Sequence, residues 1–207
     1  MPVMTGHGRR VLFVHVPKTG GTYVEDLFRA NDFQLSFWKP RRDKPAEMIS
    51  PQHYHARLLA ALFDMTAFDH VFMTVRDPLD RLISEYLMRV PDGDTPFETW
   101  AQEALDRFEK DPRHLDNHLR PQADFAMRGI TVMRQEAGLG ENLTRHLETT
   151  LDIPFAVRTV PRRRGPGKDS HAPRPDRDNL SADLLARVAT LYGRDYALFG
   201  YDRPGSS

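Results

Sequence analysis

The stretch VLFVHVPKTGGTYVEDLFRA, Val11–Ala30, decides the fold of this chain. It opens with an apolar, β-branched run, Val11–Val16, that is too short for a helix and is typical of a buried parallel strand. A turn that contains two glycines follows, and Thr22–Ala30 then places apolar side chains on one helical face. A strand that leads through such a turn into a helix is the first unit of an α/β fold, and it predicts an anion site at the turn.

The same pattern returns further along the chain. His70–Val75, HVFMTV, is a second buried strand, and the apolar stripe of Leu79–Met88 predicts a helix directly after it. Short strands are predicted at Phe33–Trp38 and Ile130–Arg134. Further helices are predicted at Ala56–Phe63, at Phe97–Phe108 with Thr95 as its cap, at Asn142–Leu151, and from Ser181 to Tyr192. Strands that alternate with helices indicate an α/β fold with a P-loop-like central parallel β-sheet flanked by α-helices.

Length and composition exclude several classes of protein. The 207 residues suit one domain, so we expect a single domain over 1–207, with 1–10 a disordered tail and 161–177 a flexible basic loop. Lysine plus arginine and aspartate plus glutamate number 29 each, which argues against a nucleic-acid partner. The chain has no cysteine, hence no thiolate metal site or disulfide. VLFVHV is shorter than the roughly 7–15 residues of a signal-peptide core, so we expect a cytoplasmic protein without membrane insertion.

The turn after the first strand gathers groups that bind anions: an ammonium, two hydroxyls, two glycines and the free amides at a helix start. Its predicted binding residues are Pro17, Lys18, Thr19, Gly20, Gly21 and Thr22. A plain strand-to-helix turn is the alternative. The nucleoside triphosphate P-loop places its lysine after the glycines, whereas Lys18 precedes them. Arg76 also stands at the end of the second strand, where a magnesium-binding carboxylate would be needed, so we expect anion binding without a metal.

VHVPKTGGT followed by VRDPLDRLISEY, Val75–Tyr86, resembles the motif pair of sulfotransferases that use 3′-phosphoadenosine-5′-phosphosulfate (PAPS). The resemblance is to the carbohydrate type, of which heparan sulfate 2-O-sulfotransferase and its bacterial relatives are the examples. It covers residues 11–30 and 53–90, and more weakly 120–201, which includes the ending DYALFGYD. It implies a PAPS donor, adenosine 3′,5′-bisphosphate as product, no metal, and an acceptor hydroxyl or amine, with a carbohydrate as the acceptor class of these examples.

The resemblance implies that the first loop binds the 5′-phosphosulfate and the second the 3′-phosphate. Arg76 and Ser84 lie eight residues apart, on a strand end and the following helix, so a guanidinium and a hydroxyl can hold one phosphate. Arg76 pairing with Asp77 or Asp80 is the alternative. Lys18 takes by analogy the role of stabilising the departing phosphate oxygen.

Sulfuryl transfer also needs a base, and histidine has a suitable pKa. In the heparan sulfate 2-O-sulfotransferases the base comes from a His-x-His pair in this part of the chain, which corresponds by resemblance to His53 and His55. On an extended loop, residues two apart face the same side, so both rings would face the donor. The spacing to Arg76 in the families that the chain resembles favours His55 slightly, and Glu25 is the next candidate, because some sulfotransferases use glutamate. A metal site at the pair lacks a third ligand nearby.

The basic loop has three open interpretations. The loop could cover the cofactor as a lid, bind an anionic acceptor, or be a solvated surface loop; its basic residues are Arg162, Arg163, Arg164 and Lys168.

Two alternatives to the sulfotransferase function remain open for the whole chain. One is a P-loop-type nucleotide kinase or phosphotransferase, and the other is a non-catalytic nucleotide-binding module.

Overall fold

The computed structural model describes residues 2–37, 49–161 and 171–205. The chain divides into two compact units. Unit 1 comprises residues 1–75 and 124–163, and unit 2 comprises residues 76–123 and 164–207. The basic residues Arg162, Arg163, Arg164 and Lys168 lie outside the described residues.

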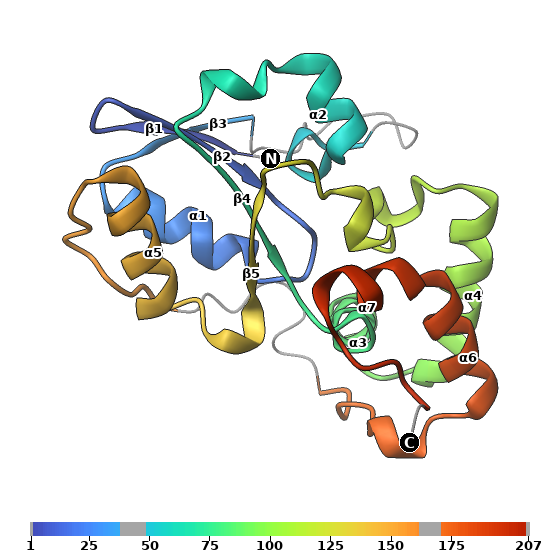
Figure 1. Cartoon of the computed structure of the whole chain (residues 1–207). Helices are drawn as coiled ribbons and strands as arrows, with labels where there is room; N and C mark the ends of the chain where they lie inside the picture. The colour runs from blue at the N-terminus through green and yellow to red at the C-terminus, as the bar shows by residue number, and fades with distance from the viewer. Residues whose placement is uncertain (1, 38–48, 162–170, 206–207) are drawn as a thin grey trace. The chain divides into compact units, whose positions relative to one another are not determined.

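Unit 1 contains a five-stranded sheet in the order β3-β1-β2-β4-β5 (Figure 1). β2 (Arg9–Val14) pairs in parallel with β4 (His70–Val75), which pairs in parallel with β5 (Thr131–Arg134). β1 (Val3–Gly6) runs antiparallel to both β2 and β3 (Gln34–Ser36). The prediction of an α/β fold with a central parallel sheet is confirmed, with β1 as an antiparallel addition.

The N-terminal residues were expected to be a disordered tail, and this is wrong, because β1 forms a hairpin with β2. The connection is His7-Gly8, whose φ angles are 52° and 73°. Positive φ at both central residues is the requirement of the tight hairpin turn that matches strand twist. β2 also ends at Val14, so His15 and Val16 lie beyond the strand that was predicted to include them.

The core of unit 1 lies between the sheet and two helices, α1 (Gly21–Ala30) and α5 (Glu141–Leu151) (Figure 1). Phe13 of β2, Phe72 of β4 and Phe28 of α1 are fully buried in it, and their rings pack together. The Phe72 ring contacts both of the others, so this aromatic packing joins α1 to the central strands of the sheet. The short helix α2 (Ala56–Leu62) belongs to the same unit.

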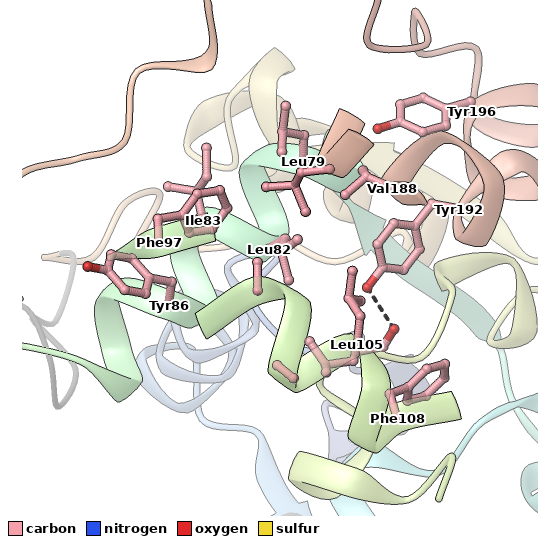
Figure 2. Close-up of a cluster of buried hydrophobic side chains, with 14 of the residues drawn as sticks. Leu79, Leu82, Ile83, Tyr86, Phe97, Leu105, Phe108, Val188, Tyr192 and Tyr196 are labelled. Carbon is pink, nitrogen blue, oxygen red and sulfur yellow. Dashed lines mark hydrogen bonds between the residues drawn. The ribbon is translucent and has the colours of Figure 1, made fainter. Parts of the chain in front are cut away.

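Unit 2 is helical in its described part. Its core is formed by α3 (Pro78–Arg89), α4 (Phe97–Lys110), α6 (Ala182–Leu191) and α7 (Gly193–Phe199) (Figure 2). Tyr192 is fully enclosed there and donates a hydrogen bond of 2.9 Å to the carbonyl of Leu119 (Figure 2).

Two helices of unit 2 begin in different ways. α6 begins after Ser181, where a helix was predicted to start, and the side chain of Ser181 caps it by accepting from the N–H of Leu184. The cap predicted at Thr95 is wrong, because α4 begins after Pro96 without a side-chain cap, and the carbonyl of Thr95 accepts from the Tyr86 hydroxyl instead. None of the described helices combines the length and the apolar character needed to cross a membrane.

Candidate functional site

The turn between β2 and α1 has an unusual backbone at its lysine. Lys18 has φ 68° and Gly20 has φ 92°, and α1 begins directly after Gly20. A residue with a Cβ is destabilised by roughly 1–2 kcal/mol in this left-handed region. Glycine would occupy this position without strain, so the strained backbone makes Lys18 a candidate functional residue of the turn.

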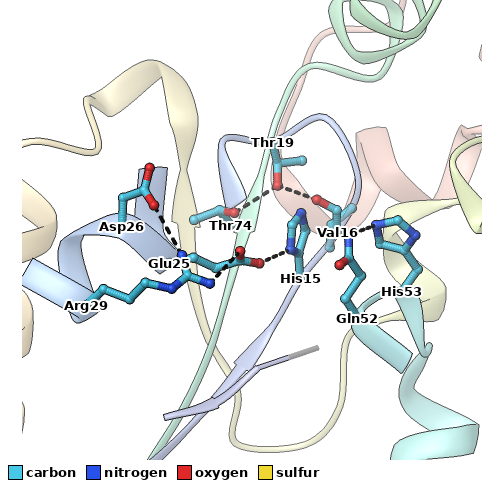
Figure 3. Close-up of polar contacts among 9 residues, drawn as sticks. All are labelled: His15, Val16, Thr19, Glu25, Asp26, Arg29, Gln52, His53 and Thr74. Carbon is cyan, nitrogen blue, oxygen red and sulfur yellow. Dashed lines mark hydrogen bonds and ion pairs between the residues drawn. The ribbon is translucent and has the colours of Figure 1, made fainter. Parts of the chain in front are cut away.

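The turn is tied to the sheet by Thr19, whose side chain is fully buried. Its hydroxyl donates to the carbonyl of Val16 at 2.8 Å and is hydrogen-bonded to the hydroxyl of Thr74 on β4, also at 2.8 Å (Figure 3). The Thr19 hydroxyl is therefore engaged by the protein. Thr22, by contrast, is exposed in the first turn of α1.

The two glycines are required because neighbouring side chains occupy the space beside them. A Cβ on Gly20 would collide with the side chain of Leu139, and one on Gly21 would collide with the imidazole of His15. The backbone of the turn is thus in direct contact with a histidine ring, which leaves no room for a side chain at the first residue of α1.

His15 is in turn held by Glu25 of α1. Its Nδ1 lies 2.9 Å from Glu25 Oε1, and the Arg29 guanidinium lies 3.7 Å from the second carboxylate oxygen (Figure 3). Burial raises the pKa of the Glu25 carboxyl, but the hydrogen bond and charge of His15 and the charge of Arg29 outweigh it and hold the pKa below its ordinary value. A buried carboxylate that is committed to two partners makes a poor general base.

The two candidate histidines before α2 lie in different environments. His53 ends a short 3₁₀ turn, is 5% exposed, and packs edge-on against the His15 ring at a centroid distance of 5.4 Å. Gln52 Nε2 donates to His53 Nε2 at 2.9 Å (Figure 3). His55 is partly exposed and precedes α2 as its N-cap residue. His53 lies in the 3₁₀ turn, whereas Tyr54 and His55 have extended backbone angles, so only part of the pair lies on the extended loop that was predicted.

In unit 2, Arg76 directly precedes Asp77, the N-cap of α3, and Ser84 lies in the second turn of that helix. Both are partly exposed. The Asp77 carboxylate accepts from the N–H of Asp80 at 2.9 Å and pairs with Arg177 at 3.3 Å. Its oxygens therefore cap the start of α3 and pair with Arg177.

The sequence did not single out Gln122, which binds the backbone of Arg76. Its side-chain amide accepts from the Arg76 N–H at 2.9 Å and donates to the Arg76 carbonyl at 2.8 Å. Gln122 lies in a stretch without periodicity, where no local signal separates a structural glutamine from a surface one.

In the described part of the chain, no three histidine, aspartate or glutamate side chains converge in a way that would hold a metal ion. The arrangement in unit 1 instead combines a lysine on a helix-start turn with imidazoles close by. Such groups bind an anion and move a proton.

Comparison with known proteins identifies the family. A family model described as the sulfotransferase family matches residues 2–202. Neither the curated proteins nor the solved structures contain a significant match. The matched range includes both the Lys18 turn and the Arg76 segment, and the chain therefore belongs to the sulfotransferase family, whose members are enzymes that transfer a sulfuryl group to an acceptor.

Proposed function

We propose that this sulfotransferase takes the sulfuryl group from PAPS, releases adenosine 3′,5′-bisphosphate, and needs no metal ion. The observation that carries the proposal is Lys18, held at φ 68° on the turn that starts α1. A helix start attracts an anion through its unpaired N–H groups and its dipole, and the lysine adds a full positive charge.

The donor is proposed to be bound in two parts. Pro17, Lys18, Thr19, Gly20, Gly21 and Thr22 surround the 5′-phosphosulfate, with Thr19 contributing through its backbone because its hydroxyl is engaged elsewhere. Arg76 and Ser84 bind the 3′-phosphate. One family match that spans both units supports treating the chain as a single sulfotransferase domain.

The reaction is an in-line displacement at sulfur. A base accepts the proton of the acceptor hydroxyl while the hydroxyl oxygen forms a bond to sulfur. The bond between sulfur and the bridging phosphate oxygen breaks at the same time. Negative charge accumulates on that departing oxygen, so the Lys18 ammonium stabilises the transition state more than the bound donor.

His55 is our first candidate for the base, and His53 is the second. The His55 ring is partly exposed and so remains accessible to an acceptor. The His53 ring is buried and its Nε2 accepts from Gln52, which suits a positioning role beside His15. The low pKa of Glu25 and its pairing with His15 place it third.

For the acceptor we propose a carbohydrate hydroxyl or amine, on the resemblance to the carbohydrate type alone. A screen with radiolabelled donor against sulfated and unsulfated oligosaccharides, with phenols as the contrasting class, tests this part separately from the donor.

The donor is tested by two measurements on the full chain. Isothermal titration should show binding of adenosine 3′,5′-bisphosphate without magnesium and tighter than ATP with magnesium. Release of adenosine 3′,5′-bisphosphate from PAPS in the presence of acceptor should then separate an enzyme from a nucleotide-binding module. Tighter binding of ATP with magnesium would favour the kinase, and binding without turnover on any acceptor would favour the module.

A further inference from the structure

The backbone of Arg76 is bound on both of its polar groups by one buried side chain. The amide of Gln122 contacts the Arg76 N–H and carbonyl at 2.9 and 2.8 Å, and Gln122 is fully buried. This two-sided contact fixes the orientation of the amide, because its oxygen can only accept and its nitrogen can only donate. It also fixes the peptide planes on either side of the Arg76 Cα.

Gln122 is itself held by Asp195 of α7. The Asp195 carboxylate accepts from the N–H groups of Gln122 and Ala123, both at 2.8 Å, and from the Gln122 side chain at 3.4 Å. Asp195 is fully buried, and burial raises the pKa of its carboxyl above the ordinary value against the opposing effects of Arg81 and these hydrogen bonds. A buried carboxylate is costly, so its presence at this point indicates a geometric requirement.

Arg81 completes the support. It is 1% exposed, donates to the carbonyls of His118 and Arg120 at 2.8 and 2.7 Å, and lies over the Tyr192 ring. Arg81 thus binds the backbone just before Gln122, and Asp195 binds the backbone of Gln122 and the residue after it.

We infer that Gln122 and Asp195 are positioning residues for the nucleotide site, which hold the Arg76 backbone so that its guanidinium meets the 3′-phosphate. The inference rests on the proposed function of Arg76. Recognition of phosphate by a guanidinium depends on direction, and a misplacement of about 1 Å is enough to weaken it severely. Since the two residues act through Arg76, their loss should reduce selection for the 3′-phosphate and leave binding of the rest of the nucleotide intact.

The experiment measures the dissociation constants of adenosine 3′,5′-bisphosphate and 5′-AMP for the full chain and its variants. Gln122→Ala should lower the affinity for the bisphosphate about tenfold, the scale of one charge-assisted contact, and change that for 5′-AMP less than about twofold. Asp195→Asn should act in the same direction with a smaller effect. Val188→Ala, in the core of unit 2, is the matched control for a purely structural change and should leave the ratio of the two constants unaltered.

The decisive variant is the double mutant. Gln122→Ala added to Arg76→Ala should reduce selectivity no further, because a residue that acts through Arg76 has nothing left to position. Unaltered selectivity in a folded Gln122→Ala protein, or fully additive losses in the double mutant, would overturn the inference while the effect of Arg76→Ala still supported the proposed function. A wild-type protein that does not prefer the bisphosphate over 5′-AMP would overturn both. If Gln122→Ala does not fold, Asp195→Asn in the same cycle decides the question.

Discussion

The turn at Pro17–Gly21 in unit 1 depends on two glycines, whose lack of a side chain makes room for its neighbours. Arg76 in unit 2 is instead held by side chains from distant parts of the chain. At the turn, Gly20 and Gly21 leave room for Leu139 and His15. At Arg76, a buried glutamine and a buried aspartate bind the backbone. A short, strained turn carries Lys18 just before the start of α1, and a buried polar network binds the backbone of Arg76.

The two regions are therefore expected to affect different kinetic quantities. Lys18 and the neighbouring histidines are proposed to act where charge changes during the reaction, so changes at these residues of unit 1 should act on turnover. Arg76 is proposed to bind a phosphate that stays unchanged in the reaction, so changes at Arg76 and its supports should act on donor affinity.

The largest effect is expected at the base. His55→Ala should lower kcat by roughly 10²–10⁴-fold, the usual contribution of general-base catalysis, with donor affinity nearly intact. The rise of the wild-type rate through the histidine pKa range should disappear in the variant. The exposed His171→Ala is the control and should keep the wild-type profile. If His53→Ala alone shows the loss, the base is His53; normal profiles in both variants would exclude the pair.

Lys18 gives the next effect. Lys18→Ala should lower kcat by about 10²–10³-fold, because one transition-state partner is lost. Lys18→Gly should be equally inactive yet more stable than Lys18→Ala by about 1 kcal/mol in urea unfolding, since glycine relieves the positive φ. The exposed Lys110→Ala serves as control. An active Lys18→Gly enzyme would refute the assigned role.

Arg76→Ala should weaken binding of adenosine 3′,5′-bisphosphate by roughly 1.5–3 kcal/mol, the value of a charge-assisted contact, and leave 5′-AMP nearly unaffected. Titration calorimetry of both nucleotides measures the difference. Arg107→Ala, a change at a largely exposed arginine of the same unit, should have no effect. Equal losses for both nucleotides would show that Arg76 does not contact the 3′-phosphate, and the contrast between the two regions would fail on the side of unit 2.

The smallest effect concerns His70, the first residue of β4 in the sheet of unit 1. Burial and then the charge of His146 lower the pKa of His70 from 6.5 to about 4, and the two Nε2 atoms lie 3.1 Å apart. The unfolded chain therefore binds this proton more tightly, so stability is complete above about pH 6.5 and falls as the pH drops toward 4.

We expect the protonation of His70 to lower the free energy of unfolding by about 1 kcal/mol. This is less than the full value of the pKa shift, because solvent reaches part of the ring. Urea unfolding of the wild type and His70→Asn between pH 7 and pH 4 measures it. The variant should show the shallower pH dependence, and identical slopes would contradict the prediction.

Most of the fold and part of the site could be predicted from the sequence because they depend on neighbours in the chain. Apolar runs predicted β2 and β4, helical periodicity predicted α1 and α3, and the glycines after a lysine located the turn that starts α1. The order of lysine and glycines separated the family from nucleoside triphosphatases without any tertiary information, because a loop that binds an anion is built from consecutive residues.

The tertiary structure alone decided the rest. Gln122 meets Arg76 across 46 residues and Asp195 across 73, and a polar residue in an aperiodic stretch carries no local sign of such a partner. The pairing of β1 with β2 and the contact of His15 with Glu25 were missed for the same reason, although Glu25 is only ten residues away. Burial turns these polar side chains from solvated groups into obligatory hydrogen-bond partners, and burial is a property of the folded chain.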